Sequence, residues 1–442
     1  MNIALRVFSV LILVLPLTGL AATITAQRPA ERAETLQLEA FVSEVLARNA
    51  KLKALTHTVE AARQRIAAAG ALPDPFLSYA GALASSGGRR GFQDRIEISQ
   101  VLPWPGKLDL QTKNASAAAN ASAQTLQDQR LQTIAAAKQL YAEWAYAHTS
   151  LTLKHRHREL LRELIQVAET RYSAGQAIQQ DVLQAHVEAA GIDTDIISHR
   201  RRIHEVQALI NALLNKPPDS PLPAPSKLPP PANIPALAEL QRAALDQHPE
   251  LQRLRQNIAA AESQLGLARK DSFPDFKFSG GYNSLWDDPD KRWWLGVTVN
   301  IPFDFSNKRD ASKQAATAEL VRHQWALSDR ESYLIAELAQ ARARLQEIGD
   351  ILTIYDQRLI PLARQSLTAA LADYRAGKGG FFSLIDAQRR QLQTQDRQLR
   401  TQSNYLRELS ALERYTGKPI DTLPLTANSV VAAPSNNVSG QW

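Results

Sequence analysis

The sequence predicts a mainly α-helical fold with a small β part, in which one structural plan occurs twice. Long segments without proline carry apolar residues at helical spacing. Each helical region is interrupted by one pair of short segments in which apolar and polar residues alternate, as they do in strands. Matching residues recur at an interval that changes little along the chain, so that Leu38 and Leu46 correspond to Leu237 and Leu245. Two copies of this length indicate a duplicated domain rather than an array of short repeats.

Residues 1–26 have the features of a secretory signal peptide. Arg6 precedes an apolar run from Val7 to Leu20, and small residues follow up to Ala26. The apolar run is shorter than the roughly 20 residues that a membrane-spanning helix needs, so we expect cleavage, with an uncleaved anchor as the alternative. The chain has 0 Cys, which excludes disulfides and thiolate metal sites.

The charges are spread along the predicted helices. The chain has 51 Lys and Arg against 44 Asp and Glu, a formal charge of +7, without a basic run. This distribution is typical of solvated helix faces and argues against nucleic-acid binding. The 9 His show no metal-ligand spacing, since His155 and His157 point to different faces of a helix. We find no catalytic constellation or phosphate loop in the sequence and expect neither an enzyme nor a cofactor or metal site.

The first structural repeat is assigned to residues 27–216. A single helix from Gly106 to Ser173 would be about 100 Å long at 1.5 Å per residue. Gly175 follows it as the expected C-terminal cap. The other elements expected in this repeat are a helix from Leu36 to Ala71, strands at about 75–85 and 92–102, and a return helix from about Gln179 to Leu214.

A proline-rich linker at 217–235 joins this repeat to the second, which is assigned to residues 236–417. Pro361 should kink the second long helix there or just before it. The elements expected in this repeat are a helix from Leu237 to Ala268, strands at about 275–284 and 292–302, and helices from Asn307 to Tyr374 and from Phe381 to Tyr415. Residues 418–442 are polar and small, and we expect a disordered tail.

The strand segments carry the sharpest pattern. Phe276 and Phe278 alternate with Lys277 and Ser279, and the segment at 292–302 alternates in the same way. Each segment is about ten residues long, the length a tilted strand needs to cross hydrocarbon. An amphipathic sheet on a water-soluble core is the alternative, which the marginal stability of lone hairpins disfavours. Aromatic residues lie near the strand ends, as in the girdle of a membrane barrel: Tyr79, Phe92, Trp286, Trp293 and Trp294.

Four strands cannot close a barrel around water. An open sheet edge in lipid also leaves unpaired backbone groups that cost several kcal/mol each. Copies of the chain must therefore share one barrel, and three copies with twelve strands give the most economical closed ring with a passage. The sequence thus predicts a homotrimer. Charged residues on the polar strand faces would line its lumen: Arg95, Glu97, Lys277 and Arg292.

An ordered set of motifs extends over nearly all of the chain after the signal peptide. The motifs are Pro73-Asp74-Pro75 at a strand entry, Gln100 to Lys107 at a strand exit, Arg171 to Gly175 followed by Asp181-Val182-Leu183, and Tyr374 to Lys378 followed by Leu384 to Gln388. This set resembles the TolC family of outer-membrane efflux proteins. The resemblance implies a trimeric duct, with a shared twelve-strand barrel in the bacterial outer membrane and a periplasmic barrel of long helices. The stretch from Leu102 to Lys107 looks most like the heavy-metal efflux branch.

The resemblance also implies partners and cargo. Family members dock on a periplasmic adaptor and an inner-membrane pump, here expected to be of the RND type, and contact outer-membrane lipid. Metal cations are the favoured cargo, with drugs or other small molecules as alternatives. A periplasmic helical adaptor or scaffold without a pore is the alternative function, but it would not need strands with an apolar face.

The resemblance assigns gate contacts to Asp181 and Tyr374. Gly379 stands where the family has a gate arginine. Gly175 and Gly377 close the two helical turns, whose tips are the expected site of adaptor binding.

The resemblance assigns the constricted tip to Asp386, with Ser383 in place of a second tip carboxylate. Three copies of Asp386 on a narrow ring would concentrate negative potential and favour cations. The alternative for Asp386, and for Asp181, is an exposed aspartate that stabilises the start of a helix.

Overall fold

The computed structural model describes residues 35–82, 93–231, 233–284, 286, 289–304 and 306–420. The signal peptide assigned to 1–26, the turn between the first two strands, Phe92 and the tail beyond residue 420 lie outside these described residues.

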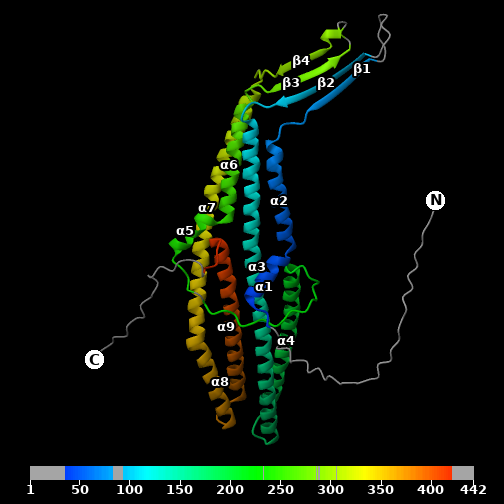
Figure 1. The fold of residues 1–442 in the computed structure, drawn as a ribbon. Coiled ribbons are helices and arrows are strands. Elements are labelled where there is room, and N and C mark those ends of the chain that lie inside the picture. The colour runs from blue at the N-terminus through cyan, green and yellow to red at the C-terminus, as the bar shows by residue number, and fades with distance from the viewer. Residues whose placement is uncertain are drawn as a thin grey trace, which may run out of the picture. The chain divides into compact units, whose positions relative to one another are not determined.

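The described chain runs twice through the same series of two helices, two strands, a long helix and a return helix, which confirms the predicted repeat (Figure 1). The first series is α1 (Leu38–Arg48), α2 (Ala50–Gly70), β1 (Phe76–Ala82), β2 (Gln93–Leu102), α3 (Lys107–Ser173) and α4 (Gln179–Leu213). The second is α5 (Leu237–Gln247), α6 (Pro249–Lys270), β3 (Phe276–Asn283), a 3-10 turn (Pro289–Lys291), β4 (Trp293–Val299), α7 (Lys308–Ile354), a π turn (Tyr355–Leu359), α8 (Ile360–Arg375) and α9 (Phe381–Thr416).

The prediction of one helix at the start of each repeat was wrong, because Asn49 and His248 break these segments. Both residues leave the helical region of backbone space, with ψ of 119° and 125°. The Asn49 carboxamide accepts a hydrogen bond from the Leu52 amide at 3.2 Å, and His248 Nδ1 accepts one from the Glu250 amide at 3.2 Å. Each side chain therefore caps the second helix of its pair. Pro249 adds to the break, because a residue before proline avoids the helical region.

The predicted long helix is confirmed: α3 is a single helix of 67 residues. It ends in a Schellman motif, in which Gly175 has φ of +70° and the Gln176 amide donates to the Arg171 carbonyl at 2.8 Å. The turn after α8 repeats this geometry at Gly377, with φ of +72°. Both glycines are required by the left-handed backbone conformation, which side chains with a Cβ rarely adopt.

Where a kink was expected, at or before Pro361, the helix has a π turn at 355–359. Pro361 has no amide to donate within the first turn of α8, and the wider turn before it accommodates this loss. The Asp356 carboxylate in the π turn accepts a hydrogen bond from the Gln398 side chain of α9.

The four strands form one antiparallel sheet in the order β1-β2-β3-β4. The two copies meet where β2 pairs with β3, from Arg95 opposite Asn283 to Leu102 opposite Phe276. Within the described sheet, β1 and β4 are the edge strands, each paired along one side. The sheet lies beyond one end of the long helices, and the α3–α4 and α8–α9 turns lie at the other (Figure 1).

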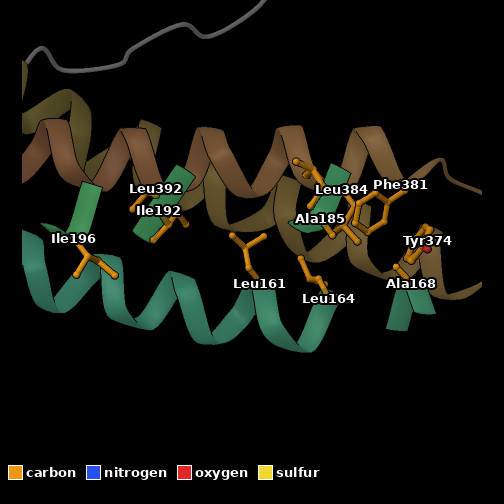
Figure 2. Packing of buried hydrophobic residues seen from close by; sticks show 11 residues of the cluster. Leu161, Leu164, Ala168, Ala185, Ile192, Ile196, Tyr374, Phe381, Leu384 and Leu392 are labelled. Atoms are coloured by element: carbon orange, nitrogen blue, oxygen red, sulfur yellow. The ribbon is translucent and has the colours of Figure 1, made fainter. Parts of the chain in front are cut away.

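The core follows the helices as successive clusters. One lies between α3, α4, α8 and α9 and has Tyr374, Phe381 and Ala168 together at one end (Figure 2). A second surrounds Phe41, Tyr141 and Trp144. Residues of the proline-rich segment close over this second cluster, where the Pro223 carbonyl accepts a hydrogen bond from the Trp144 indole at 3.2 Å. A third cluster joins α5, α7 and α9.

Replacing His248 with Asn should preserve the cap and remove a titratable group from the core. His248 is 2% exposed, and burial lowers the pKa of its imidazole, although nearby carboxylates oppose this shift. The folded state therefore favours neutral His248, and stability is lost as the pH falls through the ordinary histidine pKa of about 6.5. We expect acidification to lower the Tm of the wild type more than that of His248→Asn, measured by circular dichroism in detergent.

His57, whose side chain is 80% exposed, provides the control, and His57→Asn should leave the pH dependence of the Tm as in the wild type. His248→Ala removes the capping acceptor and should cost about 1 kcal/mol at neutral pH. Equal pH dependence in His248→Asn and the wild type would contradict the role of this imidazole.

Candidate functional site

The sheet has one face that is apolar and exposed. Directly paired residues share a face, so the register places Leu77, Ile98, Gly280 and Leu295 in one row across all four strands. Leu77 is 75% exposed and Leu295 is 93% exposed. The same face carries further exposed apolar side chains: Tyr79, Ile96, Phe278, Trp293 and Val297. The structure thus leaves uncovered a continuous surface that would normally be buried.

The opposite face is polar and brings together three of the four charged residues expected in a lumen. Glu97 accepts from Arg95 Nη2 at 2.9 Å and lies 3.8 Å from Lys277 Nζ. The Arg95 guanidinium also lies 5.4 Å from the centroid of the Trp294 ring. The structure separates Arg292 from this cluster, because Arg292 lies at the end of the β3–β4 hairpin and donates to the Trp286 carbonyl at 3.3 Å. The cluster carries a net charge of one positive unit per chain.

Aromatic residues lie at both ends of the sheet. At the hairpin end Tyr282 contacts Trp293 with ring centroids 5.4 Å apart. At the helix end Trp104 stacks on Phe273 and Phe276, with centroids 5.0 and 6.0 Å away. This second group could not be recognised as a girdle from the sequence, because its members come from both repeats. Together the two groups bound the apolar face from either side.

An ion pair fixes the sheet to the helices. Lys107, at the start of α3, is only 8% exposed, and its Nζ lies 3.0 and 3.1 Å from the two carboxylate oxygens of Asp275. Asp275 also accepts from the Trp104 amide at 2.7 Å. The contact joins the exit of β2 to the entry of β3, so it couples the two repeats where the sheet begins.

At the end of the long helices that lies away from the sheet, Arg171 in the last turn of α3 contacts the last turn of α8. Its Nη1 donates to the Tyr374 carbonyl, its Nη2 donates to the Gln176 carbonyl at 3.4 Å, and its Cζ lies 4.7 Å from the centroid of the Tyr374 ring. Tyr374 is 2% exposed and packs edge-on against Phe381 with centroids 5.3 Å apart. One guanidinium therefore joins both helical turns.

The two predicted gate residues lie in this same cluster. Burial raises the pKa of the Asp181 carboxyl, and the Arg171 guanidinium opposes that shift. Burial and then the Asp181 charge raise the pKa of the Tyr374 hydroxyl. Among the described residues, however, the Tyr374 hydroxyl and Arg171 Nε have no hydrogen-bond partner. The Asp181 charge thus acts on both Tyr374 and Arg171.

Asp386, predicted to lie in the constriction, is paired within its own helix. Its Oδ2 accepts from Arg390 Nε at 2.8 Å, and the two side chains are 35% and 74% exposed. Ser383 is exposed. The adjacent Arg389 pairs with Glu188 and links α9 to α4. The Asp386 charge is therefore partly compensated, which the sequence analysis did not anticipate.

The buried carboxylate of Glu143 joins α3, α4 and α9 between the sheet and the helical turns. Glu143 is 5% exposed and lies 3.0 Å from Arg202 Nε, 3.3 Å from Arg400 Nη1 and 4.0 Å from Arg407 Nη1. Asp396 accepts from the Tyr146 hydroxyl at 3.1 Å in the next layer. These long-range pairs had no signal in the sequence.

No helix in the described ranges is both long and apolar enough to cross a membrane. Within the same residues, no group of three or more His, Asp or Glu side chains is arranged to hold a metal ion.

The model of the family described as outer membrane efflux protein matches residues 41–216 and 240–418. The chain belongs to this family. Nodulation protein T of Rhizobium leguminosarum bv. trifolii is 22% identical over 381 residues, which cover 81% of this chain and 80% of that protein. The cobalt-zinc-cadmium resistance protein CzcC of Cupriavidus metallidurans is 22% identical over 390 residues, covering 88% of this chain and 92% of that one.

Among solved structures, the outer-membrane channel OprN matches with a TM-score of 0.76 at 21% identity, over 86% of this chain and 89% of that one. This likeness confirms the predicted fold class. The family assignment confirms the resemblance and the outer-membrane location expected from the sequence.

Proposed function

We propose that the protein is the outer-membrane channel of a tripartite efflux system and acts as a homotrimer. Three sheets close into a twelve-strand barrel, and the long helices continue the duct into the periplasm. The observation that carries this proposal is the sheet, whose apolar face is bare and whose polar face holds Arg95, Glu97 and Lys277. The apolar face would contact lipid, and the polar face would line a water-filled lumen.

The strand order supports closure by copies of the chain. The four strands alternate in direction, so β1 of one chain is antiparallel to β4 of the next when sheets are placed side by side. Such pairing satisfies the edge groups, whose exposure to hydrocarbon would cost several kcal/mol each.

The helices also carry apolar side chains that lack cover in one chain. On α4, Val187 is 69% exposed and Ile197 is 66% exposed. On α7, Trp325 is 71% exposed. Contacts between α4 of one chain and α7 or α8 of its neighbour would bury these residues, so the same trimer accounts for the sheet and the helices.

The partners proposed are a periplasmic adaptor, which would meet the turns at Gly175 and Gly377, and an inner-membrane pump of the RND type. Metal cations are the favoured cargo, since one relative is named for cobalt, zinc and cadmium resistance. Drugs or other small molecules are the alternative cargo. Conduction is passive and involves no catalysis. The rival function, a periplasmic scaffold without a pore, does not explain why one face of the sheet is apolar and exposed.

Planar-bilayer recording of the detergent-extracted protein, with its mass determined on the same sample, tests the proposal. A trimer that forms water-filled channels supports it. A water-soluble species that does not conduct would favour the scaffold.

A lysine on the apolar face should impair assembly. Val297 is 60% exposed on that face, and Val297→Lys should cost about 2–4 kcal/mol per site near the bilayer midplane. We expect fewer heat-stable trimers on electrophoresis. Ser78→Lys is the matched control, because Ser78 lies on the polar face directly opposite Glu97 and should assemble normally. Normal assembly of Val297→Lys would mean that the two faces of the sheet have been assigned the wrong way round.

Removing the Arg390 charge should leave the Asp386 carboxylate without its ion-pair partner. If three Asp386 carboxylates surround the constriction, Arg390→Gln should deepen block by Zn²⁺ in single-channel recordings, because the negative potential is no longer compensated. Asp386→Asn should weaken the block, and Arg390→Lys should resemble the wild type. Block that is the same in all four proteins would remove Asp386 from the constriction.

A further inference from the structure

We propose that Trp294 belongs to a binding site on the polar face of the sheet, and that this site takes planar aromatic molecules that carry an acidic group. The indole site is defined as Trp294 together with Arg95, Glu97 and Lys277. The inference rests on the proposed channel function and narrows its cargo, because a passing solute meets these residues only where the polar face lines a water-filled lumen.

Trp294 lies on the polar face of the sheet. The register pairs it with Gly281, which is paired in turn with Glu97. Directly paired residues share a face and neighbours along a strand alternate, so Trp294 shares the face of Glu97, while Trp293 lies on the apolar face. Contrary to the expectation from the sequence, Trp294 therefore does not belong to an aromatic girdle on the apolar face. Its position among charged residues needs another explanation.

Glycines surround the indole on this face. A Cβ at Gly296, the next residue of β4 on the same face, would come within 3.0 Å of the Trp294 ring atom Cζ3, so the ring lies along the sheet over Gly296. In the row that joins Glu97 to Trp294, the position between them is Gly281, where a Cβ would come within 2.1 Å of the Ile96 carbonyl oxygen. No side chain therefore stands between the carboxylate and the indole in this row.

The charged residues of the site expose cations and cover their shared anion. Arg95 Nη2 and Lys277 Nζ lie 2.9 and 3.8 Å from different oxygens of Glu97. The Glu97 side chain is 17% exposed, whereas those of Arg95 and Lys277 are 46% and 42% exposed. Two cations share one carboxylate, so one positive charge per chain is not compensated within the site. Both cations also keep N–H groups open to solvent.

The indole adds an aromatic surface beside these cations. The Arg95 guanidinium carbon lies 5.4 Å from the centroid of the Trp294 ring, so a planar molecule stacked on the indole lies within reach of the Arg95 charge. A carboxylate on such a molecule would pair with the guanidinium or the ammonium group. A bare metal cation would instead meet net positive charge. In this part of the duct the chemistry therefore fits the organic cargo that is the alternative under the proposed function.

The test is equilibrium dialysis of the detergent-solubilised protein against 2-naphthoate. The proteins are wild type, Trp294→Leu, Trp294→Phe, Lys277→Gln and two matched controls. Trp293→Phe changes the neighbouring indole on the apolar face. Lys113→Gln removes one positive charge from α3, where Lys113 pairs with Asp109 at 2.8 Å. Trimer yield and channel conductance are recorded for each protein.

Two further probes are applied to the wild type alone. Decalin-2-carboxylate has the same charge as 2-naphthoate but no aromatic ring, and 2-naphthylmethylammonium has the ring but the opposite charge. Both should bind at least roughly tenfold more weakly than 2-naphthoate, since one lacks stacking and the other is repelled. These comparisons do not depend on whether a variant folds.

Among the variants, we expect Trp294→Leu to raise the Kd for 2-naphthoate about tenfold, because the stacking surface is lost. Trp294→Phe should lie between Trp294→Leu and the wild type. Lys277→Gln should raise the Kd about threefold, because the site loses its net positive charge. Trp293→Phe and Lys113→Gln should bind as the wild type does.

Fluorescence quenching in reconstituted vesicles locates the Trp294 ring without a ligand. The emission that Trp294→Phe loses relative to the wild type should be quenched more strongly by iodide than by caesium, because positive charge attracts the anion. Brominated phosphatidylcholine should not quench it. The emission lost in Trp293→Phe should show the reverse, with quenching by the brominated lipid.

Equal binding of decalin-2-carboxylate and 2-naphthoate would overturn the stacking role, and tighter binding of the ammonium probe would overturn the preference for anions. Wild-type affinity in Trp294→Leu trimers, or quenching of Trp294 by brominated lipid, would remove Trp294 from the site. A wild type that forms trimeric channels but does not bind 2-naphthoate overturns this inference and leaves the proposed function intact. A wild type that forms no trimeric channel overturns both.

Discussion

Backbone hydrogen bonding at the edges of the four-stranded sheet is the constraint on which the rest of the structure depends. β1 and β4 each lack a partner along one side within the described sheet, and one face is mostly apolar and exposed. In lipid such edges are too costly to leave open, so the sheet is stable there only as part of a closed ring. The even number of strands, the paired aromatic groups and the length of the helices all suit a chain that supplies one part of such a ring.

Contacts of charged residues join the two copies at three positions along the helices. At the sheet, Lys107 of the first copy is bound by Asp275 of the second. Midway, Glu143 draws arginines from α4 and α9 onto α3. At the turns, Arg171 reaches Tyr374. Each contact is a charged group at a junction between copies, where its desolvation is offset by a specific partner. Apolar packing fills the intervals, and the ionic contacts fix the register of one copy against the other.

Local periodicity made much of this fold predictable from the sequence. The 67-residue helix, both glycine turns, the irregular helical turn before Pro361 and the alternation of the strands each follow from residues close in sequence. The breaks at Asn49 and His248 were missed because either residue also fits within an amphipathic helix. Contacts across the two copies had no local signal, so neither the register of β2 against β3 nor the contacts of Arg171 could be predicted. The Arg390 partner of Asp386 was missed although it could have been predicted, because it lies four residues away on the same helix face.

The two Schellman turns have the same backbone but different side chains. Counted from their glycines, Arg171 of the first turn corresponds to Asp373 of the second, and Asp181 corresponds to Ser383. Tyr172 and Tyr374 also correspond, so both turns carry a tyrosine, but only the first turn carries an arginine at the position before it. The contact between the two turns is therefore one-sided: the first supplies the guanidinium, and the second supplies the carbonyl and the ring. Divergence after the duplication thus gave two turns of equal backbone unequal roles within one chain.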